Sequence, residues 1–262
     1  MTLRVPAGGV ELAVDMRGEG LPVLFVHGFP FDRTMWRHQL ASLSRARCIA
    51  LDLRGVGGSG VPEADRYSLS RYADDLVAVL DALGVGEAVL CGLSMGGYVI
   101  FELLRRHPAR VKAMILADTK PQADSADAKR GRDELTRVAE REGQDAVVER
   151  LLPRLLAPVT QAEVAGQVRE MARHWSVPGL VGALRVLRDR PDSTETLRGV
   201  RVPTLVLVGS DDEITPPDTA RAMAQLIPGA ECRVVPAAGH LSPLEQPAAT
   251  NRLVDAFLQG LG

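Results

Sequence analysis

The run Gly92-Leu93-Ser94-Met95-Gly96 constrains the fold of this chain more than any other stretch of its sequence. An apolar segment at 88–90 leads into the run and a helical pattern follows it, so the serine is expected at a sharp turn between a strand and a helix. Such a turn exposes the serine hydroxyl, and it needs glycines because larger side chains would collide with the neighbouring strand or helix. The helix that follows would direct its first amides and its positive dipole end toward the same point. The run therefore predicts a strand–turn–helix unit that presents Ser94 as a candidate nucleophile.

Short apolar runs alternate with amphipathic segments over most of the chain. Apolar runs of this length are typical of buried parallel strands, which are covered on both faces and show no polar alternation. Strands are predicted at 3–5, 10–17, 23–26, 48–51, 88–90, 111–116, 204–208 and 232–235, and helices at 32–43, 70–83, 95–107 and from 247 onward. This alternation indicates an α/β fold in which helices flank a mostly parallel central sheet.

The stretch 121–198 breaks the alternation because it contains no convincing strand pattern. Helices are predicted near 126–142, 144–156, 161–175 and 178–190. We expect this stretch to form a helical cap, or lid, inserted after the sixth strand, with 1–120 and 199–262 forming the core. A cap above the sheet would exclude water and shape a binding pocket.

His240 is the candidate base for Ser94. It stands in a loop just beyond the strand predicted at 232–235, where a histidine can approach a hydroxyl from another strand end. Gly239 precedes it, and it follows both the serine and the candidate acids along the chain, which is the order of one known group of catalytic triads. His27 also follows a strand directly, but it is expected to hold its loop in shape through hydrogen bonds.

The acid partner of the histidine has several candidates, because only one carboxylate can accept from the ring. Three of them follow the strand at 204–208, namely Asp211, Asp212 and Glu213. We choose Asp212, with Asp211 as second choice and Asp118, at the end of the preceding strand, as third. The acid would keep the imidazole in the tautomer whose free nitrogen faces the serine, and it would stabilise the imidazolium that forms.

Two backbone N–H groups are candidates for an oxyanion hole. Met95 directly follows the candidate nucleophile, so its N–H lies at the amino end of the predicted helix. Phe29 follows the strand predicted at 23–26, and its N–H can point toward the same oxygen. Donors placed in this way stabilise the negative charge that develops during acyl transfer.

The composition excludes several other classes of protein. The chain has 262 residues with 31 basic and 33 acidic side chains, and this balance argues against a nucleic-acid-binding surface or a polybasic membrane patch. Its three cysteines are isolated and have no metal-ligand spacing, so they are expected to be reduced thiols. The first residues lack an export pattern, and no apolar run approaches the roughly 18 residues that span a bilayer. We therefore expect a cytoplasmic protein that does not bind membranes.

Taken together, the motifs resemble those of the α/β-hydrolase fold family. The resemblance covers essentially the whole chain, and it rests on five segments: His27-Gly28-Phe29-Pro30, Asp52-Leu53-Arg54-Gly55-x-Gly57-x-Ser59, Gly92-x-Ser94-x-Gly96-Gly97, Gly209-x-x-Asp212-x-x-Thr215-Pro216 and Gly239-His240. In that pattern the spacing from Gly209 favours Asp212 over Asp211. Within the family the chain is similar to small bacterial carboxylesterases, and also to enol-lactone hydrolases and cofactor-free haloperoxidases or perhydrolases.

The resemblance implies a serine carboxylesterase that hydrolyses short- to medium-chain esters through an acyl-enzyme, without a metal or organic cofactor. The substrate would be a small-molecule ester. Haloalkane dehalogenases and epoxide hydrolases of this fold carry an aspartate where Ser94 stands, so those reactions are disfavoured. The alternatives are a lactonase, a carbon–carbon bond hydrolase of aromatic degradation, a perhydrolase side activity and, from another class, a ligand-binding receptor. The sequence leaves the natural substrate and the oligomeric state open.

Overall fold

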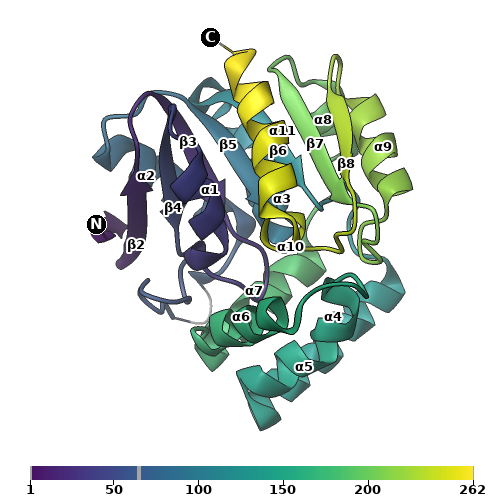
Figure 1. The fold of residues 1–262 in the computed structure, drawn as a ribbon. Coiled ribbons are helices and arrows are strands. Elements are labelled where there is room, and N and C mark those ends of the chain that lie inside the picture. Colours follow the sequence, from purple (N-terminus) through teal and green to yellow (C-terminus); the bar gives the residue numbers. More distant parts are fainter. Residues whose placement is uncertain (1, 64–65, 262) are drawn as a thin grey trace.

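The computed structural model describes residues 2–63 and 66–261, and one twisted sheet runs through its centre (Figure 1). Within these residues the sheet has eight strands in the order β1-β2-β4-β3-β5-β6-β7-β8. The strands are β1 (Thr2–Ala7), β2 (Val10–Arg17), β3 (Leu21–Val26), β4 (Ala46–Leu51), β5 (Ala88–Leu93), β6 (Val111–Ala117), β7 (Thr204–Gly209) and β8 (Glu231–Val235). Strand β2 is antiparallel to β1 and β4, and the other neighbouring pairs are parallel. The predicted mostly parallel sheet is confirmed.

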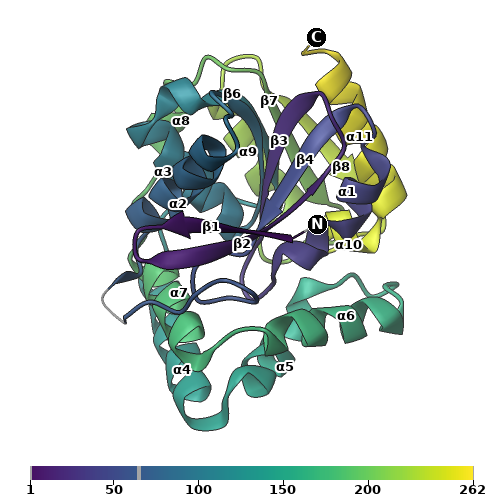
Figure 2. The same cartoon turned by 90° about the vertical axis from the view of Figure 1, so that its left-hand side faces the viewer.

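Helices cover both faces of the sheet, which is why its central strands are apolar throughout. Every residue of β5 and β7 is buried. One face packs against α2 (Leu69–Ala82), α3 (Met95–Arg106), α8 (Thr194–Arg198) and α9 (Pro217–Leu226). The other face packs against α1 (Arg37–Ser42), α10 (Ser242–Glu245) and α11 (Pro247–Gln259). In Figure 2 the two groups of helices lie on opposite sides of the strands.

Four helices lie beyond the carboxyl ends of the parallel strands, and we call them the cap helices. They are α4 (Ala126–Glu142), α5 (Gln144–Leu155), α6 (Ala162–Arg173) and α7 (Val177–Asp189). They follow β6 in the chain and form a separate layer below the sheet, opposite the C-terminus (Figures 1 and 2). Their bounds agree with the four predicted helical segments to within three residues. The cap as an inserted helical layer is confirmed, whereas its exact limits, 121–198, stay a prediction.

The two ends of the cap are fastened to each other. The N–H of Ser193 donates to the carbonyl of Pro121 over 2.8 Å. The guanidinium of Arg190 forms a buried ion pair of 2.7 Å with Asp124, and it stacks over the ring of Tyr98 in α3 at 4.3 Å. These contacts join the segment that enters the cap, the segment that leaves it and the helix that follows Ser94.

Several short elements differ from the sequence prediction, including the unpredicted helices α8 and α10. The helix expected over 32–43 is a 3-10 turn, η1 (Arg33–Trp36), followed by the short helix α1. Asp32 caps this turn, because its carboxylate accepts from the N–H of Thr34 over 2.8 Å. Helix α9 was not predicted, although Pro216 and Pro217 at its start are common at the first helical positions, where no N–H donor is needed. In the described part of the chain, no helix combines the length and apolar character needed to cross a membrane.

Candidate active site

Ser94 occupies the turn between β5 and α3, as the sequence predicts. Its backbone has φ +51° and ψ −110°, a conformation that residues other than glycine rarely adopt. The surrounding packing holds the residue in this strained conformation. A Cβ atom on Gly96 would lie 2.2 Å from the carbonyl oxygen of Val26, and one on Gly92 would lie 2.6 Å from the carbonyl carbon of Gly96. The two glycines are therefore required by the close approach of strand β3, the turn and helix α3.

Three side chains from separate strand ends form one hydrogen-bonded chain. The Oγ of Ser94 lies 2.9 Å from Nε2 of His240, which stands in the loop between β8 and α10. The Nδ1 of the same ring lies 2.9 Å from Oδ2 of Asp212, which follows β7. This arrangement can remove the proton from the serine hydroxyl as the oxygen attacks an electrophile, and it can hold the resulting imidazolium beside a carboxylate.

The surroundings of Asp212 favour its ionised form. Burial raises the pKa of this carboxyl, but the charge of His240 and the hydrogen bonds from His240 and Thr215 outweigh burial and lower the pKa to about 2. Its Oδ1 accepts from the N–H groups of Ile214 (2.8 Å) and Thr215 (3.0 Å), and its Oδ2 accepts from the hydroxyl of Thr215 (2.6 Å). The carboxylate is thus fixed in orientation and stays charged at neutral pH.

The other candidate acids lie elsewhere. Asp211 is exposed and accepts a hydrogen bond of 2.6 Å from the hydroxyl of Ser210. Asp118 is fully buried, but it accepts from the N–H of Gly209 (2.8 Å) and from the hydroxyl of Ser242 (2.6 Å) instead of a histidine ring. Burial and the nearby charge of Asp212 raise the pKa of Asp118 well above its usual range. The geometry therefore favours Asp212 over both Asp211 and Asp118.

The two candidate oxyanion donors follow neighbouring strands. Val26 at the end of β3 pairs in register with Gly92 near the end of β5, so the segments that carry Phe29 and Met95 emerge side by side. In the part of the chain that the structure describes, neither backbone N–H donates a hydrogen bond to a protein acceptor. His27 shapes this loop, because its Nδ1 donates to the carbonyl of Gly28 over 2.9 Å and its Nε2 accepts from another loop.

The turn between cap helices α6 and α7 packs against the same loop. The indole N–H of Trp175 donates to the carbonyl of Phe31 over 2.8 Å, and its ring meets the ring of Phe29 edge-on at 5.3 Å. Nδ1 of the neighbouring His174 lies 2.5 Å from Oδ2 of the buried Asp32. The cap is thus joined to the loop that carries one of the two candidate donors.

Sequence reasoning missed two residues that hold the site together. Thr215 stands in the motif that singles out Asp212, yet its contribution of two donors to that carboxylate becomes visible only in three dimensions. Glu245 contacts the backbone on both sides of His240, and no local pattern around it indicates that contact. Within residues 2–63 and 66–261, no cluster of three or more metal-ligating side chains is present.

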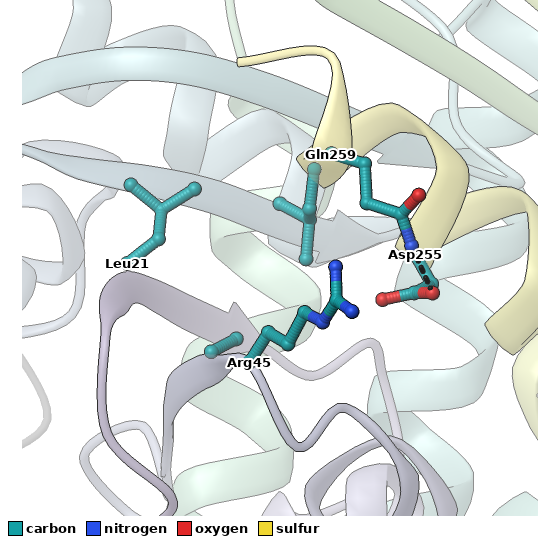
Figure 3. Close-up of a pocket in the computed structure, with 6 residues that line it drawn as sticks. Leu21, Arg45, Asp255 and Gln259 are labelled. Atoms are coloured by element: carbon teal, nitrogen blue, oxygen red, sulfur yellow. Dashed lines mark hydrogen bonds between the residues drawn. The ribbon is translucent and has the colours of Figure 1, made fainter. Parts of the chain in front are cut away.

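A separate cavity lies at the opposite end of the parallel strands, where they begin, and does not include the three aligned side chains. It has a volume of about 380 Å³ and is lined by Leu21, Arg45, Ala46, Asp255, Leu258 and Gln259 (Figure 3). Leu21 and Ala46 begin strands β3 and β4, whereas Ser94 follows the carboxyl end of the parallel strand β5. Ligand sites of open α/β sheets lie at the carboxyl ends of the strands, so we do not assign this cavity to the chemistry.

Comparisons with known proteins show the family to which the chain belongs. The model of the alpha/beta hydrolase fold family matches residues 22–247. The structure is similar to that of a thermophilic esterase from Thermogutta terrifontis, with a TM-score of 0.93 and 40% identity over 100% of this chain and 99% of that one. It is also similar to an enol-lactonase from Burkholderia xenovorans, with a TM-score of 0.90 and 28% identity over 98% and 100% of the two chains. A 2-hydroxy-6-oxo-2,4-heptadienoate hydrolase of Pseudomonas putida is 30% identical, over 97% of this chain and 95% of the relative.

Proposed function

Because the chain belongs to the alpha/beta hydrolase fold family, we propose that it is a serine carboxylesterase acting on short- to medium-chain esters of small molecules. The hydrogen-bonded chain from Ser94 through His240 to Asp212 carries the proposal, because acyl transfer to a serine needs those three groups in that order. The 40% identity to a bacterial esterase along the whole chain supports an ester as the substrate.

In the first half of the reaction, Oγ of Ser94 attacks the ester carbonyl carbon while Nε2 of His240 takes its proton. The carbonyl oxygen becomes an oxyanion that accepts hydrogen bonds from the N–H groups of Phe29 and Met95. The tetrahedral intermediate then collapses, the bond to the leaving oxygen breaks, and His240 returns the proton to that oxygen. An alcohol departs and an acyl-enzyme on Ser94 remains.

In the second half, a water molecule takes the place of the alcohol. His240 removes a proton from the water as the oxygen attacks the acyl carbon, and the same two N–H groups bind the second oxyanion. Collapse of this intermediate releases the carboxylic acid, and the proton on His240 returns to Ser94. Asp212 holds the ring orientation in both halves and stabilises the imidazolium each time it forms.

Removal of the nucleophile tests the proposal. We expect Ser94→Ala to lower the turnover of p-nitrophenyl acetate and butyrate by a factor on the order of 10⁶, because no other side chain in the proposed reaction can form the acyl-enzyme. The thermal unfolding midpoint should stay close to that of the wild type, since the substitution removes one partly exposed hydroxyl. Full hydrolytic activity in a folded Ser94→Ala protein would refute the proposal.

A lactonase is the second candidate, since a lactone is a cyclic ester and the likeness to an enol-lactonase extends over 98% of the chain. The same catalytic steps would open the ring without releasing a separate alcohol. Rates measured on acyl esters of increasing chain length, on enol-lactones and on dienones under one set of conditions decide between an esterase, a lactonase and a carbon–carbon bond hydrolase. A preference for lactones of more than about tenfold in kcat/KM would favour the second candidate.

A further inference from the structure

Glu245 lies five residues after His240, at the end of the short helix α10. Its Oε1 accepts from the N–H of Gly239 over 2.9 Å and from the N–H of Leu241 over 3.1 Å. These two amides flank His240 on either side, so one carboxylate oxygen holds the backbone of the loop that carries the proposed base. Hydrogen bonds to an ionised acceptor are stronger than those between neutral groups.

The other oxygen of the same carboxylate faces the cap. Oε2 of Glu245 accepts from the N–H of Ala157 over 2.7 Å and from the hydroxyl of Thr160. Both donors belong to the connection between cap helices α5 and α6. A single side chain therefore joins the loop of the proposed base to the cap, through four donors.

Two further contacts bring the same segments together. The N–H of His240 itself donates to the carbonyl of Leu155, the last residue of α5, over 2.9 Å. A Cβ atom on Gly239 would lie 2.6 Å from the backbone nitrogen of Ala157, so only glycine permits this approach. The backbone of the proposed base is thus fastened at positions 239, 240 and 241, and each of the three bonds involves the cap or Glu245.

We infer that Glu245 is a positioning residue, which sets the place of the His240 ring by fixing the loop backbone against the cap. The inference rests on the proposed function, in which His240 is the base. In the described part of the chain, the Glu245 carboxylate makes no hydrogen bond to Ser94, Asp212 or the imidazole, so it acts through the backbone. The imidazole must contact Ser94 and Asp212 at the same time, at 2.9 Å each. A displacement of the ring by about 1 Å can lower the rate on the order of 10²-fold.

A double-mutant cycle tests this role with the variants E245Q, H240A and E245Q/H240A. An amide keeps the shape of the carboxylate but has only one acceptor oxygen, so E245Q cannot serve both pairs of donors. We expect E245Q to lower kcat for p-nitrophenyl butyrate about 10- to 100-fold with KM changed by less than about threefold, because the base acts in the transition state and not in substrate binding. On the H240A background the same substitution should change the residual rate by less than about twofold, since there is no ring left to misplace.

The matched control is E102Q, which places the same substitution on α3, where Glu102 pairs with Arg105 at 2.7 Å. This variant should leave kcat unchanged relative to the wild type and relative to H240A. An equal loss from E245Q with and without His240 would show a general structural role and overturn the inference, as would an unchanged kcat in E245Q. Full activity in H240A would refute the proposed function itself, and the inference with it.

If E245Q does not fold, T160V provides the same test from the cap side. It removes one donor to Oε2 and keeps the volume of the side chain. We expect a loss in kcat of about two- to tenfold that disappears on the H240A background. A loss that persists without His240, or no loss at all, would contradict the positioning role.

Discussion

At the residue scale, two buried carboxylates at the ends of neighbouring strands have opposite properties. Asp212 is surrounded by three donors and an imidazole, and these lower its pKa to about 2. Asp118 has two donors and the charge of Asp212 beside it, and burial together with that charge raises its pKa. Two charged carboxylates this close would repel each other, so the site holds one of them more readily in its neutral form.

This contrast predicts opposite effects of pH on stability in two variants. The pKa of Asp212 is lower in the folded state than its ordinary value of 3.8, so its stabilising contribution is present above pH 3.8 and is lost as the pH falls toward 2. The difference in the free energy of unfolding between wild type and D212N should therefore shrink by about 2 kcal/mol as the pH falls from 4 to 2.

For Asp118 the folded pKa is raised, so its stabilising contribution is complete below pH 3.8 and is lost as the pH rises through the folded value. D118N should therefore gain stability relative to wild type as the pH rises from 4.

Urea unfolding of wild type, D212N and D118N, from pH 2 to values above pH 4, measures both effects. Subtracting the unfolding free energy of each variant from that of the wild type cancels the titration of the other carboxylates. The two difference curves should have slopes of opposite sign. Parallel curves for D212N and D118N would contradict the contrast between the two sites.

The positions of the candidate nucleophile and the proposed base could be found from the sequence because each is marked locally. Ser94 stands between glycines that only a close approach of backbones explains, and His240 follows a glycine at a strand end. The choice between Asp211 and Asp212 needed the family spacing, because adjacent residues in a turn differ only in which way they face. Thr215 and Glu245 were missed because their partners are brought near by tertiary folding, and a polar residue in a loop gives no sign of that.

At the element scale, the turn between α6 and α7 supports the loop of the proposed oxyanion hole. Trp175 is buried, donates to the carbonyl of Phe31 and packs edge-on against the ring of Phe29. The carbonyl of the preceding His174 accepts from the N–H of Gly57 over 2.8 Å, which fastens the turn on its other side. A loop held between these contacts keeps the N–H of Phe29 ready before substrate arrives, and such preorganisation is the main source of electrostatic catalysis.

We therefore expect W175F to lower kcat about tenfold while KM changes little, since oxyanion contacts form only in the transition state. W36F is the matched control, because Trp36 is equally buried but its indole N–H has no hydrogen-bond partner among the described residues. Both variants lose similar volume, and only W175F loses a hydrogen bond to the loop. Steady-state kinetics on one p-nitrophenyl ester measures the effect, and equal losses in the two variants would contradict the supporting role of Trp175.

Secondary structure could be predicted from the sequence where the hydrophobic pattern is strong. The prediction failed where the pattern is weak. The central strands are apolar because both faces are covered, and the cap helices α4, α5 and α6 are amphipathic because only one side of each is buried. Helix α9 was missed because it is short and only Ala220, Met223 and Ala224 of its residues are buried. The 3-10 turn η1 was missed because it begins at a side-chain cap from Asp32, and that cap changes no hydrophobic period.

At the scale of the whole molecule, several contacts join the cap to the core, and two of them lie at the proposed catalytic groups. Arg190 at the end of the cap stacks over Tyr98 of α3, Trp175 contacts the loop of Phe29, and Glu245 joins the cap to the loop of His240. The parallel sheet brings the ends of β5, β7 and β8 together, and the cap rests on the loops that follow. In this account the core supplies the chemical groups and the cap fixes two of their loops.

We propose that Ser94 carries the acyl group between the two halves of the reaction. Rapid acid quenching of the enzyme during turnover of p-nitrophenyl acetate, followed by mass spectrometry of its peptides, tests this claim directly. We expect one added acetyl group on Ser94, and none on any peptide of the Ser94→Ala variant. Acetylation confined to another residue, or sustained turnover of the ester by the folded Ser94→Ala protein, would contradict it.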